Sequence, residues 1–328
     1  MRGAARNLLA GNLVAFPTET VYGLGGDACN ADAVERIYSV KGRPTDHPLI
    51  VHISSMQRMG DWAEEIPEYA ITLARDFWPG PMTLVLKRSS LAKDFITGGQ
   101  NTLGIRVPNH VVALALLKAF ESIGGKGVAA PSANRFGQVS PTTAAAVVDE
   151  IGEYLDSADL IIDGGACTVG VESTIIDCTG AAPKILRPGA ITVAMIEQST
   201  GLEVIKWGSA DAQEGAANTP TSNLISSADT GIRVSGSLEN HYAPAAKVLL
   251  CETPTPGQGF IAHANMQTPA GVIRLASPQS DEEFAQILYS ALREADAQGL
   301  KEVVVMQPIG IGIAVAIRDR LARAANGR

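Results

Sequence analysis

Residues 16–53 read FPTETVYGLGGDACNADAVERIYSVKGRPTDHPLIVHI, and this stretch decides the fold of the first half of the chain. An apolar run, residues 13–16, leads into this stretch and predicts a buried strand. Pro17 ends the run, and residues 18–26 are rich in hydroxyl groups and glycine, a composition typical of a turn. The stretch therefore begins with a strand that leads into a polar, glycine-rich turn.

The second half of the stretch adds a helix and a cationic turn. Asn30 is placed to cap a helix whose apolar residues recur at helical spacing. Lys41 and Arg43 follow on a tight turn, and an apolar strand, residues 49–53, contains His52. Strand, polar turn, helix, cationic turn and strand in this order are typical of a binding site.

The composition is that of an ordinary globular protein with two domains. The chain has 328 residues, more than one domain usually needs, and 46% of them are hydrophobic and 18% charged. No apolar run approaches the roughly 20 residues that a membrane span requires, and the N-terminus lacks a signal-peptide pattern. We therefore expect a cytoplasmic protein without membrane contact.

Charge and residue spacing disfavour two further classes. The formal net charge is -8, from 26 basic and 34 acidic residues, and no segment has the basic excess of a nucleic-acid groove. The histidines show no metal-ligand spacing, and neither do the four cysteines, Cys29, Cys167, Cys178 and Cys251. We expect reduced thiols in the core and no structural metal.

Strand and helix patterns alternate through residue 205. Short apolar runs bounded by turn residues predict strands at residues 82–87, 103–107, 128–131, 160–162, 173–177 and 184–186. Helical patterns occupy residues 68–78 and 111–120, a segment from Ser140 and Pro141 to residue 154, and a segment from residue 192. The fold class is therefore α/β, with residues 1–205 forming one domain around a twisted mixed sheet.

A change in composition separates a second domain. Residues 206–240 contain few large apolar side chains, and the motif HYAP, which includes Tyr242, follows abruptly. We interpret residues 206–244 as an interdomain linker or a lid over the site. Strand patterns at residues 248–251, 260–262, 272–275 and 303–306, with helices at 281–298 and 312–325, predict a smaller Rossmann-like α/β domain over residues 245–328.

Four cations stand beside proline or glycine turns at the mouths of predicted elements: Lys41, Arg43, Arg106 and Arg187. Arginine on a rigid turn suits fork-like binding of carboxylate or phosphate, whereas lysine acts there as a point charge. For any one of them, a surface cation near a turn is an equally good interpretation. Four in one domain, without a surrounding basic run, favour an anion-binding site.

Hydroxyl and amide side chains cluster in the motifs PTET, PSAN, VSPTT and VEST. Ser132 and Asn134 directly follow an apolar strand, where α/β folds place ligands. Ser140 has the alternative role of capping a helix. No GxSxG elbow surrounds Ser132 and no Walker motif is present, which disfavours acyl-enzyme hydrolases and P-loop proteins. The glycines of residues 23–26 lack the third glycine of a dinucleotide loop.

Several motifs together resemble the YrdC-like family of threonylcarbamoyl-AMP synthases: PTETVYGLG, KGRPxDxPLIVHI, IRVP, APSAN, SPTTA, GVESTIID and LRPGAI. They stand in the family's order and cover the first domain. HYAP followed by an α/β tail is similar to the longer, two-domain form of these enzymes. The resemblance therefore extends over nearly the whole chain.

The resemblance implies a nucleotidyl transfer that joins L-threonine, bicarbonate and ATP into threonylcarbamoyl-adenylate and releases pyrophosphate. It implies Mg2+ accompanying ATP, and downstream proteins that use the product to modify tRNA. The implied ATP site comprises Lys41, Arg43, His47, Thr102, Ser132, Asn134, Ser140, Arg187 and Tyr242, with His47 in a place where we expect asparagine in many relatives. The implied threonine site comprises Thr20, His52, Arg106, Ala130 and Ser173. Catalytic roles fall on Lys41, Arg43, Ser132 and Asn134.

Two other classes of function stay open at this point. YrdC-like domains are proposed to bind double-stranded RNA, but the acidic balance and the lack of interleaved aromatic residues argue against RNA binding as the main role. Carbamoyl transferases that resemble hydrogenase-maturation proteins share this domain, but they carry additional cysteine clusters that this sequence lacks. We therefore expect a synthase.

Overall fold

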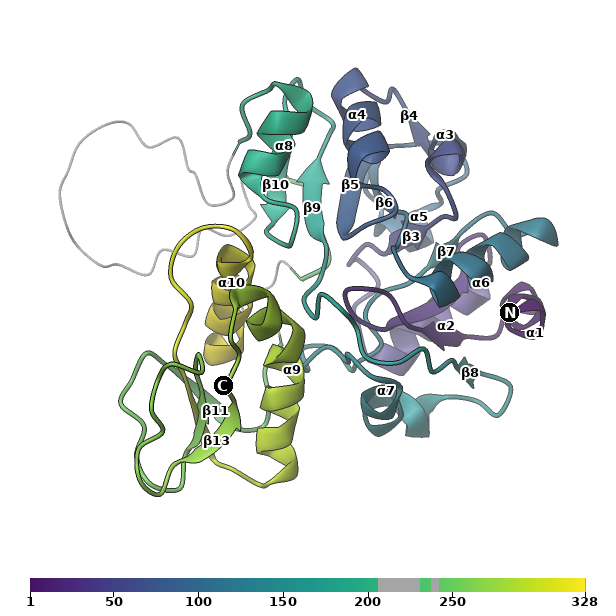
Figure 1. The fold of residues 1–328 in the computed structure, drawn as a ribbon. Helices are drawn as coiled ribbons and strands as arrows, with labels where there is room; N and C mark the ends of the chain where they lie inside the picture. The colour runs from purple at the N-terminus through teal and green to yellow at the C-terminus, as the bar shows by residue number, and fades with distance from the viewer. Residues whose placement is uncertain (206–230, 237–241, 328) are drawn as a thin grey trace.

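The computed structural model describes residues 1–205, 231–236 and 242–327 (Figure 1). The first part holds a ten-stranded mixed sheet, and the C-terminal part holds a four-stranded sheet whose strands are all parallel. These sheets confirm the predicted α/β class and the mixed first sheet. No helix in the described ranges is long and apolar enough to cross a membrane.

The first sheet has the strand order β10-β9-β5-β6-β3-β7-β2-β1-β8, and β4 pairs with β5. Parallel pairs join β9 to β5, β6 to β3 and β1 to β8. The strands are β1 (Val14–Phe16), β2 (Gly23–Asp27), β3 (Ile50–His52), β4 (Ala63–Glu64), β5 (Met82–Arg88), β6 (Thr102–Arg106), β7 (Val128–Ala129), β8 (Leu160–Ile161), β9 (Thr174–Asp177) and β10 (Lys184–Arg187). In the centre, the register of β3 and β6 sets His52 opposite Arg106.

The glycines of residues 23–26 lie in strand β2, so our prediction that they belong to the polar turn is wrong. Strand β2 pairs antiparallel with β1. A Cβ atom on Gly25 would lie 2.8 Å from side-chain atoms of both Phe16 and Val128. Glycine therefore serves close packing at this position, and the polar turn is confined to residues 17–22.

Helices cover both faces of the first sheet. They are α1 (Arg2–Leu9), α2 (Ala31–Lys41), α3 (Met59–Trp62), α4 (Glu68–Phe77), α5 (Asp94–Thr97), α6 (Val111–Ser122), α7 (Ala144–Ile151) and α8 (Val193–Thr200), with 3-10 turns at Met56–Arg58 and Gly152–Tyr154. Val14 and Phe16 pack with α1 and α6, whereas Leu13 and Ala15 belong to the core that includes α2 and α4. The two cores follow from the alternation of side chains along a strand.

Part of the predicted linker lies across the first sheet. Val234 is buried against Val85 and Ile175, and Ile232 packs on the same cluster. Residues 231–236 therefore cover part of the face formed by β5 and β9. The rest of the predicted linker, residues 206–230 and 237–241, lies outside the described residues.

The C-terminal sheet has the order β11-β14-β12-β13. Its elements are β11 (Lys247–Leu250), β12 (Gly259–Ile261), β13 (Ile273–Ala276), α9 (Asp281–Ala297), β14 (Glu302–Val305) and α10 (Ile313–Asn326). The predicted cap of α9 is confirmed, since Ser280 Oγ accepts a hydrogen bond from the Glu283 amide at 3.2 Å. The parallel pairing agrees with the prediction, and the finer Rossmann-like assignment stays a prediction.

Helices α9 and α10 lie between the C-terminal sheet and the first domain (Figure 1). Their apolar residues share one buried cluster with Val21, Val139 and Val171 of the first domain. The two sheets are therefore joined through a continuous apolar core, and side chains of α9 and α10 can reach residues of the first domain.

Two local predictions are wrong. Helix α7 begins at Ala144 and is capped by Thr143, whose Oγ1 accepts from the Ala146 amide, so Ser140 is not the cap. Among the cysteines, Cys167 and Cys178 are buried as expected, but Cys29 and Cys251 are exposed free thiols.

Candidate functional site

A cavity opens where the β1–β2 turn, the end of α2, strands β3 and β6, the segment after β7 and the end of β10 meet. Ser235, Gly236 and Tyr242 close it from the C-terminal side of the sequence. The predicted site residues that line this cavity are Thr20, Lys41, Arg43, His52, Arg106, Ala130, Ser132, Ser173, Arg187 and Tyr242. Segments distant in sequence thus meet at one place, as the motifs predicted.

Lys41 is the last residue of α2, and its ammonium group is buried. Asn30 Oδ1 caps the start of this helix, and Gly42 ends it in a left-handed conformation with φ 62°. Lys41 Nζ donates to the carbonyl oxygens of Ser132 and Asn134, both at 2.5 Å. Burial, followed by the nearby Arg43 charge, holds the pKa of Lys41 well below its usual value.

Arg43 and Arg187 reach the same side of the cavity from different elements. Arg43 Nη2 donates to the Pro48 carbonyl at 2.8 Å and to Ser235 Oγ at 3.1 Å. Arg187 Nη1 donates to the Ser235 carbonyl at 2.9 Å, and its Nε and Nη2 donate to the Ser173 carbonyl at 3.1 and 2.9 Å. Burial lowers the pKa of Arg43 to about 10 and also lowers the pKa of Arg187.

We call Lys41, Arg43 and Arg187 the cationic end of the cavity. All three are buried, and within the described parts of the chain none forms an ion pair. Their hydrogen-bond partners among the described residues are neutral carbonyl and hydroxyl oxygens. Buried cations that lack a counter-charge are costly, and a polyanion that entered the cavity would offset that cost.

The opposite side of the cavity holds a buried ion pair. Arg106 Nη2 lies 2.7 Å from Glu19 Oε1, and both side chains are 5% exposed. The two groups are not aligned for a hydrogen bond, so Arg106 Nε and Nη2 and both Glu19 oxygens retain hydrogen-bonding capacity within the described residues. Arg106 Nε and Nη2 can therefore still donate to a bound carboxylate in a two-point contact.

His52 lies beside this pair. Burial, followed by the Arg106 charge, lowers the pKa of His52 to about 3, so the ring is neutral at pH 7. Its Nδ1 has no hydrogen-bond partner among the described residues. We call Glu19, Arg106 and His52 the ion-pair end of the cavity; its net charge is zero, whereas the cationic end is positive.

Four predicted site residues do not line this cavity. Asn134 is buried beside Lys41, and its side-chain amide donates to the carbonyls of Arg135 and Gln138. Ser140 donates its hydroxyl to Glu172 Oε1 at 2.7 Å.

The other two of these residues, Thr102 and His47, lie farther out. Thr102 lines a neighbouring cavity beneath residues 233–235. His47 packs edge-on against Phe136, a residue of the main cavity, with ring centroids 5.5 Å apart.

The sequence motifs contained two further site residues that we did not single out. Glu19 stands in PTET and Glu172 in VEST, and both are buried acids. Their position, an acidic residue inside a hydroxyl-rich motif next to an apolar strand, could have indicated that they belong to the site. Ser235, which touches both arginines of the cationic end, stands in a stretch without any such signal.

The fold and the cavity are those of a two-domain YrdC-like protein with a cavity lined by buried cations. A family model described as "Telomere recombination" matches residues 6–189, and one described as "Threonylcarbamoyl-AMP synthase, C-terminal domain" matches residues 191–326. The threonylcarbamoyl-AMP synthase of Pyrococcus abyssi is 38% identical over 343 residues, which cover 100% of this chain and 94% of that protein. The chain belongs to the threonylcarbamoyl-AMP synthase family.

Two more comparisons agree with this assignment. The threonylcarbamoyl-AMP synthase of Bacillus subtilis is 37% identical over 343 residues, covering 99% of this chain and 92% of that protein. The crystal structure of P. abyssi Sua5 complexed with L-threonine superposes with a TM-score of 0.84 at 37% identity, covering 100% of this chain and 94% of that one. The similarity therefore spans both domains.

Proposed function

We propose that this chain is a nucleotidyltransferase that condenses L-threonine, bicarbonate and ATP in the cavity between its cationic and ion-pair ends. The observation that carries the proposal is the contrast in charge within one cavity: three buried cations without an ion pair at one side, and a buried arginine–glutamate pair at the other. A triphosphate needs the first environment, and a zwitterionic amino acid suits the second.

The cationic end would bind the phosphates of ATP. Arg43 and Arg187 offer planar forks, and Lys41 offers a point charge whose position is fixed by two carbonyls. Ser132, Asn134 and Ser140 lie near this end. We assign His47, Thr102 and Tyr242 to the surroundings of the nucleotide, with Thr102 and His47 outside the cavity lining.

The ion-pair end would bind L-threonine. Arg106 would hold the carboxylate, and Thr20 and His52 would contact the remaining polar groups, with Ala130 and Ser173 completing the wall. A solved P. abyssi relative contains L-threonine, which supports an amino-acid site in this fold. Because His52 is neutral, it can contact the substrate without adding charge.

The reaction proposed here needs positioning rather than a side-chain nucleophile. The threonine amine and bicarbonate form a carbamate and release water. A carbamate oxygen then attacks the α-phosphorus, and the bond from that phosphorus to the leaving pyrophosphate breaks. Lys41, Arg43 and Arg187 would stabilise the charge that develops on the pyrophosphate, and the two ends of the cavity would hold the reactants in line.

Magnesium fits this cavity as a partner of ATP rather than as a resident ion. Glu172 is the one acidic residue among the described residues that line the cavity, and its oxygens already accept from Ser140, Tyr289 and Arg320. No group of three His, Cys, Asp or Glu side chains in the described ranges could hold a metal. Phosphate oxygens and water would therefore supply most ligands of the ion.

The interdomain segment would act as a lid over the nucleotide. Residues 231–236 lie on the first sheet, and Ser235 contacts both Arg43 and Arg187. Gly236 has a φ of +80°, and a Cβ there would lie 2.3 Å from the Tyr242 hydroxyl oxygen. A closed lid would exclude water from the labile product before downstream proteins use it to modify tRNA.

One assay tests the proposal. Purified protein is incubated with ATP, threonine and bicarbonate, and each is omitted in turn while the adenylate product and pyrophosphate are quantified. We expect product only in the complete mixture. Product formation without threonine or without bicarbonate would overturn the assignment, and a salt-dependent shift of duplex RNA without product would favour RNA binding instead.

A further inference from the structure

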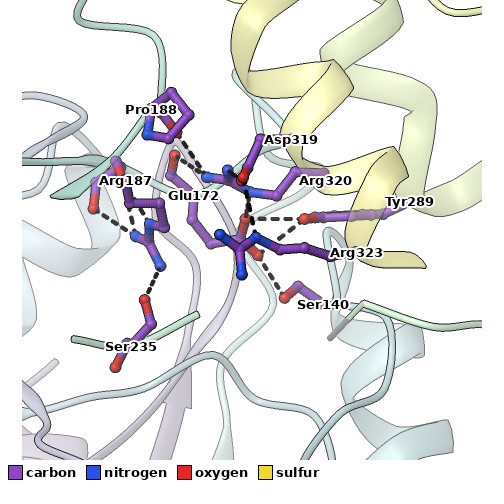
Figure 2. A network of polar contacts seen from close by, with 10 residues as sticks. Ser140, Glu172, Arg187, Pro188, Ser235, Tyr289, Asp319, Arg320 and Arg323 are labelled. Atoms are coloured by element: carbon purple, nitrogen blue, oxygen red, sulfur yellow. Dashed lines mark hydrogen bonds and ion pairs between the residues drawn. The ribbon is translucent and has the colours of Figure 1, made fainter. Parts of the chain in front are cut away.

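The C-terminal domain reaches the cavity wall through a buried arginine of helix α10, Arg320 (Figure 2). Its Nε donates to Glu172 Oε2 at 2.7 Å, and its Nη2 donates to the Pro188 carbonyl at 3.0 Å. Glu172 directly precedes Ser173, and Pro188 directly follows Arg187. One side chain of the second domain therefore holds two segments that carry cavity residues.

The Glu172 carboxylate is fully engaged by donors. Ser140 donates to Oε1 at 2.7 Å, and Tyr289 of helix α9 donates to Oε2 at 2.9 Å (Figure 2). Burial alone raises the pKa of Glu172, but the charges of Arg320 and Arg187 and the Ser140 hydrogen bond bring it down to about 2. Glu172 is therefore ionised at neutral pH although it is buried.

An ionised Glu172 poses a problem for a cavity that takes a polyanion. Glu172 lines the same cavity as Lys41, Arg43 and Arg187. In a buried setting, a bare carboxylate there would repel phosphates strongly, because screening by water is weak. Arg320 compensates this charge, and Asp319, which pairs with Arg320 Nη1 and with Arg323 Nε, helps to hold Arg320 in place.

We propose that Arg320 is a positioning residue for ATP: it shields the Glu172 carboxylate from the phosphates and ties Glu172 to Pro188, so that the Arg187 guanidinium keeps its direction. The inference rests on the proposal that the cationic end binds ATP. It assigns part of the nucleotide site to the C-terminal domain, through a residue that does not line the cavity.

The hydrogen bonds of Arg187 show how the tie at Pro188 acts on the site. Arg187 Nε and Nη2 both donate to the Ser173 carbonyl, and Nη2 also approaches Ser173 Oγ at 3.2 Å. The Arg187 fork is thus oriented by the residue next to Glu172. Arg320 holds the neighbours of both residues, Glu172 beside Ser173 and Pro188 beside Arg187. Without Arg320, we therefore expect the Arg187 guanidinium to lose its fixed direction.

A second arginine between the domains provides a matched control. Arg293 of helix α9 pairs with Glu150 of helix α7 at 2.9 Å and donates to the Val139 carbonyl. Neither Arg293 nor Glu150 lines the cavity. If Arg320 served only to dock the domains, replacing either arginine would have similar consequences for ATP.

The experiment compares Arg320→Met with Arg293→Met by calorimetric titration with ATP, alongside the KM for threonine. We expect the Kd for ATP to rise about tenfold or more in Arg320→Met, because a charged contact is lost and an anion is uncovered. Arg293→Met should stay within about twofold, and the KM for threonine should change by less than about threefold in both. Equal changes in the two variants, or equal changes for the two substrates, would overturn the proposal.

A second substitution that removes the Glu172 charge distinguishes loss of shielding from destabilisation of the fold. Adding Glu172→Gln to Arg320→Met removes the uncovered charge at nearly constant shape, so ATP affinity should improve about threefold or more over Arg320→Met, and the lost contact to Pro188 should keep it below wild type. A double variant that binds ATP no better than Arg320→Met overturns the shielding role. If Arg320→Met does not fold, Tyr289→Phe replaces it as the test, because it removes one donor to Glu172 and keeps the aromatic ring. We expect the Kd for ATP to rise measurably in Tyr289→Phe. An unchanged Kd would contradict the shielding role.

The wild-type measurements separate this inference from the proposed function. Wild-type protein that binds ATP without making the adenylate would refute the proposed reaction, while the variants would still decide the role of Arg320. Wild-type protein that does not bind ATP would refute both.

Discussion

The two ends of the cavity use the same kind of side chain, a buried arginine, in opposite electrostatic settings. At the cationic end, Arg43 and Arg187 donate to carbonyl and hydroxyl oxygens and form no ion pair within the described residues, and Arg320 engages the nearby Glu172 carboxylate. At the ion-pair end, Arg106 lies 2.7 Å from Glu19. Without a ligand, the cationic end carries a positive charge that no ion pair offsets, whereas the ion-pair end is neutral.

This difference explains how one cavity could distinguish two substrates that both carry negative groups. ATP brings several charges, which the cationic end can offset, whereas threonine brings one carboxylate and one ammonium and needs no net charge from the protein. Coulomb attraction at the cationic end would draw a triphosphate there rather than to the Arg106–Glu19 pair. The comparison also predicts different outcomes when each end is altered.

The largest effect should come from removing charge at the cationic end. In Lys41→Met/Arg43→Met, two charge-assisted contacts to phosphate are lost, each worth about 2 kcal/mol. Adenylate formation should therefore fall about 1,000-fold or more, measured as initial rates at fixed ATP. The double variant Arg75→Met/Lys87→Met removes one exposed arginine and one exposed lysine and should keep wild-type rates. Near-normal turnover of Lys41→Met/Arg43→Met would refute the phosphate assignment.

Removing Arg106 should separate the two ends. Arg106→Met should raise the KM for threonine about 100-fold, because a two-point contact to the carboxylate is lost, and should leave the KM for ATP within about threefold. It should also lower the free energy of unfolding by about 3 kcal/mol, since Glu19 stays buried without its partner.

A double variant sharpens the Arg106 experiment. Adding Glu19→Gln removes the unpaired charge, so Arg106→Met/Glu19→Gln should recover most of the lost free energy of unfolding in urea titrations. Threonine binding should not recover. Parallel increases in KM for ATP and threonine would mean that the cavity does not have two separate ends.

A smaller effect should come from the lid over the cationic end. Gly236→Ala would place a Cβ 2.3 Å from the Tyr242 hydroxyl oxygen and 3.0 Å from Arg187 Nη1. We expect the Kd for ATP to rise about tenfold, because the lid can no longer close on Arg187. Gly231→Ala is the control, since Gly231 also has a positive φ, +66°, but a Cβ there would meet nothing within 4 Å. Equal losses in the two variants would assign the effect to backbone strain alone.

The sequence was most informative where function depends on local motifs. Lys41 ends the helix that Asn30 caps, and Arg43 follows on a turn that glycine and proline fix, so their place beside the cavity could be predicted from spacing. The strands of both sheets followed from short apolar runs, except β2 and β4, which were not predicted. Glycine misled us at residues 23–26, because its lack of a Cβ serves turns and close strand packing equally well.

Contacts between distant segments could not be predicted. Arg320 and Glu172 are 148 residues apart, and Ser140 and Glu172 are 32 apart. Ser140 before Pro141 has the local pattern of a helix cap, but its hydroxyl goes to Glu172 because the C-terminal helices bring a charged network to that point. Such pairings depend on how two domains pack, and a single sequence holds no periodic signal for them.

The smallest predicted effect tests why the ion-pair end is neutral. Burial and the Arg106 charge lower the pKa of His52 from 6.5 to about 3. Between these values the unfolded chain binds a proton and the folded chain does not, so His52 lowers the free energy of unfolding as the pH falls below 6.5. From pH 7 to pH 5.5 this loss is about 1 kcal/mol. His52→Gln should therefore lose less stability than wild type over that interval in urea titrations, while other histidines contribute equally to both proteins. Identical pH dependence would mean that His52 takes up a proton in the folded protein, and the ion-pair end would then be positive like the cationic end.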